Sequence, residues 1–115
     1  MSMIESSTAA DQQEALLVFE KAAELFGLMA APIRLRIISE LCQGERNVSQ
    51  LLERVDASQS NMSQHLATLY RAGVLARRRE GAQVYYRLGD QRVASLCRTV
   101  CTDVAIGMPA PSGGR

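Results

Sequence analysis

The spacing of hydrophobic and polar positions changes along the chain, and the changes mark its elements. From about Gln12, apolar residues recur every three or four positions, which predicts a long first helix. A second helix is predicted from Pro32 to Gly44, because proline suits a first helical turn and glycine commonly follows the last one. The two apolar stripes comprise Leu16, Phe19, Ala23, Phe26 and Ala30, and then Leu35, Ile38, Leu41 and Cys42.

The next segment predicts two short helices joined by a tight turn. Val48 to Val55 has apolar residues at helical spacing, and Asp56 and Ala57 provide the turn. Ser58 stands at the N-cap position of a further helix that ends near Gly73. One face of that helix is hydrophobic and is predicted to be buried, with Met62, Leu66, Leu69 and Tyr70 on it.

Two strands and a final helix follow. Val74 to Arg79 and Gln83 to Leu88 alternate around a turn at Glu80, Gly81 and Ala82, which predicts a hairpin. Apolar residues at helical spacing from Val93 to Val104 predict a last helix. Helix, turn, helix and hairpin in this order form a winged helix-turn-helix. We therefore predict a mainly α fold of about five helices with a two-stranded wing.

The polar residues of this unit are typical of DNA binding. Hydroxyls and amides near a helix N-terminus can reach base edges in the major groove, and arginines on a hairpin can contact phosphates. His65 lies within this helix, so a phosphate or base contact is favoured over metal binding. The predicted DNA-binding residues are Ser58, Gln59, Ser60, Asn61, Ser63, Gln64, His65, Arg77, Arg79 and Gln83.

Charge is distributed unevenly, although the net charge is only +1. Residues 71–92 contain six arginines against Glu80 and Asp90, whereas residues 1–30 contain five acidic residues and Lys21 alone as a base. A near-neutral chain with a local basic region is compatible with DNA binding. An enzyme is not expected, since the chain has no glycine-rich phosphate loop, no paired carboxylate motif and no nucleophile beside a base.

Three strings in order resemble the ArsR/SmtB family of small repressors: LMAAPIRLRIISEL, SQSNMSQHLATLYRAGVL and RRREGAQVYYRL. The resemblance covers about residues 14 to 105. It implies a homodimeric repressor that binds a double-stranded operator with inverted half-sites and is released by a small inducer. It also implies that the first and last helices pack across a two-fold axis, although their apolar stripes could instead complete the core of the monomer.

The three cysteines are the candidate sensing residues. Cys42 lies near the end of the second helix, and Cys97 and Cys101 are one turn apart on the last. Spacing by four residues places two thiols on one face at about 6 Å between Cβ atoms, which suits a shared soft metal better than a disulfide. A crosslink or metal joining Cys42 to Cys97 or Cys101 would tilt the last helix and alter the half-site spacing.

The sensor sites of several relatives are missing from this chain. Arsenic and cadmium sensors of the family carry a Cys-x-Cys cluster where this chain has Asn47, Val48 and Ser49. Zinc and cobalt sensors use histidine and acidic residues on the last helix, but only Asp90 and Asp103 remain near it. The pattern is most similar to thiol-based sulfur and redox sensors of the BigR, SqrR and HlyU type, which pair a second-helix cysteine with one on the last helix. Compared with those two positions, Cys42 lies about one turn later and Cys101 about one turn earlier.

Three explanations for the cysteines therefore remain open. The preferred one is a switch driven by reactive sulfur species or oxidants without a cofactor. The second is a metal or metalloid bound by Cys97, Cys101 and Cys42. The third is that the thiols are inert and fill apolar stripes.

The ends of the chain and its compartment can also be predicted. Residues 1–11 and 107–115 are expected to be flexible tails, with one domain at 12–106. No apolar run is long enough for a membrane span, and no secretion signal is seen, so the cytoplasm is expected.

Overall fold

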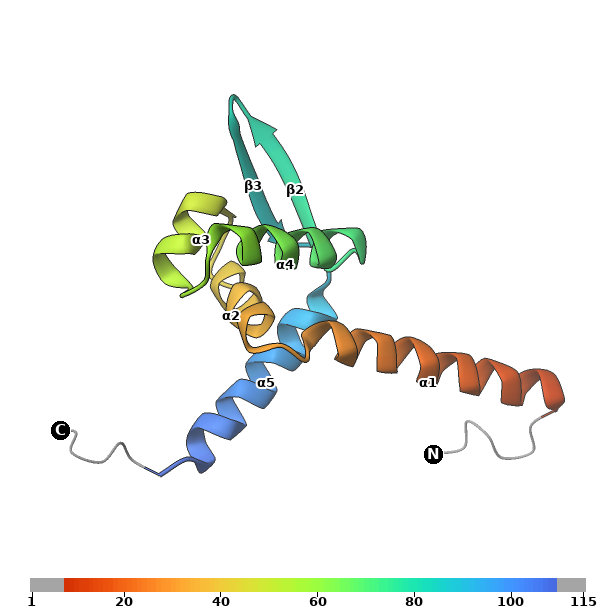
Figure 1. Cartoon of the computed structure of the whole chain (residues 1–115). Helices are drawn as coiled ribbons and strands as arrows, with labels where there is room; N and C mark the ends of the chain where they lie inside the picture. The colour runs from red at the N-terminus through yellow and green to blue at the C-terminus, as the bar shows by residue number, and fades with distance from the viewer. Residues whose placement is uncertain (1–7, 110–115) are drawn as a thin grey trace.

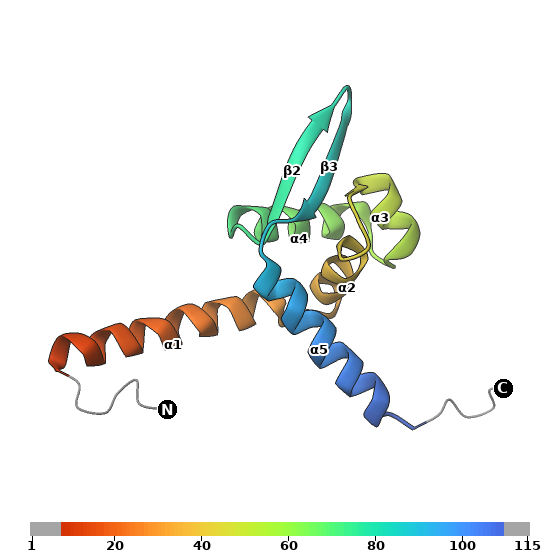
Figure 2. The same cartoon turned by 180° about the vertical axis from the view of Figure 1, so that it is seen from behind.

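The first helix extends away from the rest of the molecule. The computed structural model describes residues 8–109, and α1 (Ala9–Met29) projects from the other elements while α5 (Gln91–Gly107) runs past its C-terminal end (Figures 1 and 2). Helix α1 starts earlier than the predicted Gln12, because Thr8 and Asp11 form a capping box. The Thr8 hydroxyl accepts from the Asp11 amide, and the Asp11 carboxylate accepts from the Thr8 amide, both at 3.2 Å.

The predicted tails differ from the structure where helices extend into them. Residues Ala9 to Asp11 are helical, and α5 reaches Gly107. The remainder of both predicted tails, residues 1–7 and 110–115, lies outside the described residues. Within residues 8–109, no helix is long and apolar enough to cross a membrane.

The helix-turn-helix lies above α2 (Pro32–Leu41). Helix α3 (Val48–Arg54) is followed by a four-residue connection and then by α4 (Gln59–Arg71), as predicted. The Ser58 hydroxyl caps α4 by accepting from the Asn61 amide at 3.0 Å. Beyond α4, Gly73 has a φ of +82°, a conformation that favours glycine and ends the helix.

The predicted two-stranded wing is present, and a short third strand that was not predicted extends its sheet. Strands β2 (Leu75–Glu80) and β3 (Gln83–Leu88) pair antiparallel, and β1 (Arg46–Asn47) adds to the other edge of β3. Arg46 pairs with Tyr86, and Asn47 pairs with Tyr85. Two residues are too few to show an alternating pattern, so β1 had no signal in the sequence.

The core lies where α2, α3, α4 and α5 meet the base of the wing. Ile37, Ile38, Leu51, Met62 and Val93 are fully buried there. Each is large and branched or flexible, and their burial fixes how the helices pack.

Two predicted stripes are less buried than expected. Tyr70, predicted with the core face of α4, is 36% exposed. The stripe of α1 is largely open to solvent, with Leu16, Phe19 and Phe26 each more than half exposed. This chain therefore does not bury these side chains by itself.

Candidate nucleic-acid interface

The exposed face of α4 carries the polar residues predicted to contact DNA. Gln59, Ser60, Asn61, Ser63 and Gln64 are all exposed. Within residues 8–109, none of these five side chains is held in a hydrogen bond by another protein group. Ser58 differs, because its hydroxyl is used as the helix cap. The face is thus a set of donors and acceptors beside a helix N-terminus, which suits base edges and phosphates.

His65 is set back from this face. It is half-buried, and its Nδ1 accepts a hydrogen bond from Arg34 Nε at 3.1 Å. Arg34 also donates from Nη1 to the carbonyl of Leu28 at 3.2 Å. Sequence reasoning missed Arg34, since it is 31 residues away from His65 and no local pattern links the two.

The pleat of the wing separates residues that were predicted to act together. Cross-strand partners share a face, and Arg77 is opposite Tyr86 while Arg79 is opposite Val84. Gln83 is opposite Glu80, so it shares the other face with Arg78 and not that of Arg77 and Arg79. Contact of any of them with DNA stays a prediction.

Arg77 connects the wing to α4. Its guanidinium carbon lies 3.9 Å from the centre of the Tyr70 ring. The neighbouring Tyr86 hydroxyl, and Tyr70 to a lesser degree, raise the pKa of Arg77. The exposed position of Tyr70 is explained by this stacking, which places the base of the wing against α4.

Arg78 is held by acidic groups and an aromatic ring. It forms ion pairs with Glu45 at 2.8 Å and Glu80 at 2.7 Å, and its guanidinium lies over the Tyr85 ring at 4.7 Å. These carboxylates raise the pKa of Arg78, and the Arg78 guanidinium lowers the pKa of Glu45. Arg79 and Arg87 differ, because within residues 8–109 they take part in neither an ion pair nor a cation–π contact.

The cysteines form one close pair and one separate site. The Cys97 and Cys101 sulfurs are 3.8 Å apart, with Cys97 only 2% exposed and Cys101 exposed. Burial raises the pKa of Cys97 to about 11, and its thiol points at the Leu35 carbonyl at 3.7 Å. Cys42 is half-buried, and Arg98 donates to its sulfur at 3.8 Å. In the part of the chain that is described, no three His, Cys, Asp or Glu side chains are grouped as metal ligands.

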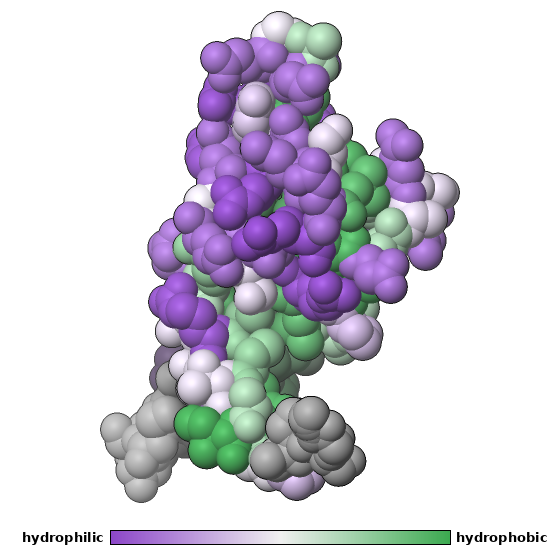
Figure 3. Space-filling view, turned by 90° about the vertical axis from the view of Figure 1, so that its left-hand side faces the viewer, coloured by the Kyte–Doolittle hydropathy of each residue, from purple (hydrophilic) through white to green (hydrophobic). Residues whose placement is uncertain are grey.

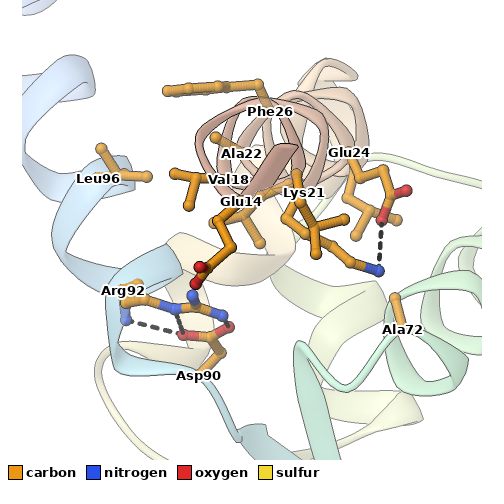
Figure 4. A pocket seen from close by; sticks show the side chains of 13 residues that line it. Glu14, Val18, Lys21, Ala22, Glu24, Phe26, Ala72, Asp90, Arg92 and Leu96 are labelled. Carbon is orange, nitrogen blue, oxygen red and sulfur yellow. Dashed lines mark hydrogen bonds and ion pairs between the residues drawn. The ribbon is translucent and has the colours of Figure 1, made fainter. Parts of the chain in front are cut away.

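A groove of about 880 Å³ runs between α1 and the start of α5 (Figure 4). Leu17, Val18 and Leu25 line it from α1, and Leu96 lines it from α5. At its edge Arg92 binds Asp90 at 2.8 Å, which lowers the pKa of that carboxyl. The groove is mainly hydrophobic, and a second ion pair at its edge joins Lys21 and Glu24 at 3.9 Å.

Hydrophobic and hydrophilic surfaces are segregated. In Figure 3 the hydrophilic residues gather over the wing and the elements beneath it, whereas hydrophobic residues emerge lower down, where α5 ends. Val100, Val104 and Ile106 are each more than half exposed on that helix. Together with the stripe of α1 they give the lower half a large apolar surface.

Comparison with known proteins identifies the family. Residues 31–77 match the family described as "Bacterial regulatory protein, arsR family". Reduced HlyU from Vibrio cholerae superposes with a TM-score of 0.72 at 36% identity, over 76% of this chain and 93% of that one. The chain belongs to the ArsR family. This ArsR-family chain is also similar to the BigR repressor from Xylella fastidiosa, with a TM-score of 0.72 and 27% identity over 90% of this chain and 99% of that one.

The similarity confirms the predicted family and the winged helix-turn-helix fold. It also confirms that the chain is a regulatory protein and not an enzyme. The repressor SmtB of Mycobacterium tuberculosis is 37% identical over 79 residues, which are 69% of this ArsR-family chain and 58% of that repressor. The chain thus aligns with about three-fifths of the length of this curated relative.

Proposed function

We propose that this chain is a DNA-binding transcriptional repressor that acts as a homodimer. The main support is the exposed polar face of α4 beside an arginine-rich wing, which gives one element for base edges and another for phosphates. SmtB and BigR are both named as repressors, which agrees with this function. The carboxylate partners of Arg78 make Arg79 and Arg87 the better-placed cations for phosphate contact.

DNA-binding measurements can distinguish the role of α4 from the role of the wing. Replacing Arg77 and Arg79 with alanine should weaken binding to every duplex and lower the dependence of log Kd on log salt concentration. Replacing Gln59, Ser60 or Gln64 with alanine should instead relax base preference at defined operator positions. Fluorescence anisotropy with a selected operator and a random duplex measures both effects. An unchanged salt slope in the wing variant would contradict the phosphate role.

Dimerisation is supported by the apolar surface of α1 and α5. Leaving Phe19, Phe26, Val100 and Val104 in water is unfavourable, and a two-fold interface would bury both copies of each. The two wings of such a dimer would contact two half-sites. A chain that is monomeric at micromolar concentration in analytical ultracentrifugation would contradict this part of the proposal.

We further propose that the cysteines form a switch for reactive sulfur or oxidants. Cys101 is exposed, so it is the sulfur that an inorganic polysulfide reaches first on α5. One sulfur atom is transferred to the Cys101 thiolate, and the polysulfide leaves one atom shorter. A neighbouring thiol then attacks the persulfide, which forms a disulfide and releases hydrogen sulfide.

The crosslink would change the shape of α5. The Cys97 and Cys101 sulfurs must approach from 3.8 Å to the bond length of about 2.05 Å, and the Cβ atoms of an intact helix at this spacing are too far apart for a disulfide. Closing that pair, or joining either residue to Cys42, therefore distorts α5 or moves it against α2. Because α5 carries part of the proposed dimer surface, the half-site spacing changes and the operator is released.

A thiolate-bound metal or metalloid is the second candidate signal. Two thiolates on a tetrahedral metal with bonds of about 2.3 Å lie about 3.8 Å apart, which matches the observed sulfur separation. Cys97 and Cys101 would supply two ligands. Because reactive sulfur is the preferred signal, polysulfide is tested first, with peroxide and arsenite in parallel.

One experiment distinguishes the signals. The reduced protein is treated with each reagent, and its intact mass and operator affinity are then measured. Gain of sulfur or loss of two hydrogens with weaker binding supports the thiol switch, and gain of arsenic with weaker binding supports the metalloid. Unchanged mass and affinity in all three treatments would contradict both, and so would an unchanged response in a variant with all three cysteines replaced by alanine.

A further inference from the structure

A small cleft lies on the side of α4 that faces away from the wing. It has a volume of about 320 Å³ and is bordered by α2 and the second half of α4. Every polar residue around it supplies a hydrogen-bond donor, and no carboxylate lines it. The lining residues are Arg34, Gln64, His65, Ala67, Thr68 and Arg71.

The position of the cleft follows from the helical repeat. At 100° per residue, the buried Met62 marks the core side of α4, and Tyr70 lies on the flank that contacts the wing. His65 and Thr68 lie on the opposite flank, and Arg71 points outward between the two flanks. The cleft and the wing are therefore on opposite sides of the same helix.

A helix in the major groove has a phosphate backbone on each side of it. The groove is about 12 Å wide and a helix with its side chains measures about 10–12 Å, so both strands come close to the flanks. On one flank, Arg77 of the wing lies over Tyr70 of α4. The other strand must then pass the flank that carries the cleft.

Arg34 determines what His65 offers to this cleft. Since Arg34 Nε donates to His65 Nδ1 at 3.1 Å, the neutral ring carries its proton on Nε2, which is a donor. Arg34 is itself fixed by its second bond to the Leu28 carbonyl. A donor imidazole beside Arg71 and the Thr68 hydroxyl suits a phosphate oxygen.

We infer that this cleft binds a phosphate of the DNA strand opposite the wing. Arg71 and Thr68 contact the phosphate, His65 donates from Nε2, and Arg34 is a positioning residue that holds the tautomer of His65. The inference rests on the proposed DNA-binding function. In this arrangement, phosphate contacts hold α4 on both of its flanks.

The salt dependence of binding to a random-sequence 24-base-pair duplex tests the phosphate contact. Arg71→Gln should lower the slope of log Kd against log salt by about 0.9 for each lost phosphate, hence by about 1.8 for a dimer. Thr68→Val should weaken binding severalfold with little change in slope. Arg98→Gln, which removes the same charge from α5, is the matched control and should leave the slope near the wild-type value.

His65 gives a second readout because it is the only histidine in the chain. A long-range proton–nitrogen NMR spectrum of the imidazole should show the Nε2–H tautomer, and Arg34→Gln should make it a mixture. Adding the duplex should shift the Nε2 signal in the wild-type protein and much less in Arg71→Gln. Inorganic phosphate at constant ionic strength, without DNA, serves as the comparison probe.

The outcomes distinguish failure of the cleft inference from failure of the proposed DNA-binding function. Absence of any salt-dependent duplex binding by the wild type would overturn the proposed function. Wild-type binding with a lower slope in Arg79→Ala but an unchanged slope in Arg71→Gln would overturn the cleft inference alone. A shift of His65 by millimolar phosphate together with an unchanged slope in Arg71→Gln would mean a small-anion site, which also overturns it.

Discussion

Cys97 should react very slowly with an external alkylating reagent in the folded protein, and the expected factor follows from its surroundings. Its side chain is 2% exposed, and burial raises its pKa from 9.0 to about 11. A change of two pKa units lowers the thiolate fraction near pH 7.5 by about 100-fold, and only the thiolate attacks an alkylating reagent. The predicted rate of Cys97 alkylation is therefore at least about 100-fold lower in the folded than in the unfolded chain.

The measurement compares the alkylation rate of each cysteine in the folded protein with its rate in the unfolded protein. The protein is treated with iodoacetamide at one pH with and without urea, the reaction is stopped at intervals, and modification of Cys42, Cys97 and Cys101 is quantified by mass spectrometry of the digest. The exposed Cys101 is the internal reference, since unfolding changes its access least. Alkylation of folded Cys97 within tenfold of its unfolded rate would refute the reasoning from burial.

The same thiol should make stability depend on alkaline pH. The pKa of Cys97 is higher in the folded chain than in the unfolded chain. The contribution of this thiol to the free energy of unfolding is therefore complete below about pH 9 and is lost as the pH rises through about 11. In Cys97→Ala this part of the decline should be absent. Urea unfolding of both proteins between pH 8 and 11 measures the difference, and parallel declines would be inconsistent with a buried thiol.

Three further predictions concern the wing, the dimer and the core. Arg78→Ala should release the wing from Glu45 and speed hydrogen exchange of β3 amides severalfold, and an exchange rate equal to that of Arg87→Ala would argue against this tie. Phe19→Asp should raise the dissociation constant of the proposed dimer by about 100-fold or more, because two side chains worth about 1.5–3 kcal/mol each leave the interface. Sedimentation boundaries in analytical ultracentrifugation that match those of the wild type would contradict it. Ile37→Ala should lower the free energy of unfolding by about 2–5 kcal/mol in urea with an unchanged m-value, since Ile37 is fully buried.

The local elements were predictable because each has its own signal in the sequence. Ser58 caps α4, Gly73 ends it with a positive φ, and the alternation of residues 83–88 gives β3 within its observed bounds. Strand β1 and the start of α1 were missed. The former is two residues long, and the latter depends on a capping pair, Thr8 and Asp11, in which aspartate takes the place of the usual glutamate.

The candidate site was predictable only as far as residue types allowed. The polar face of α4 could be listed from the sequence, but the partners of its neighbours could not. Arg34 reaches His65 across 31 positions, and Glu45 reaches Arg78 across 33. Such pairs depend on how elements pack, and a single sequence carries no record of that packing.

Asn47 belongs to two elements at once, and this limits how the proposed repressor could leave its operator. Its backbone lies in β1 against Tyr85 of the wing, while its side chain caps α3 by accepting from the Gln50 amide at 2.9 Å. The wing therefore cannot swing without disturbing the first helix of the helix-turn-helix. Each half of a dimer would move as one rigid block, so an inducer would leave the preferred half-site sequence unchanged and alter only the tolerated distance between half-sites.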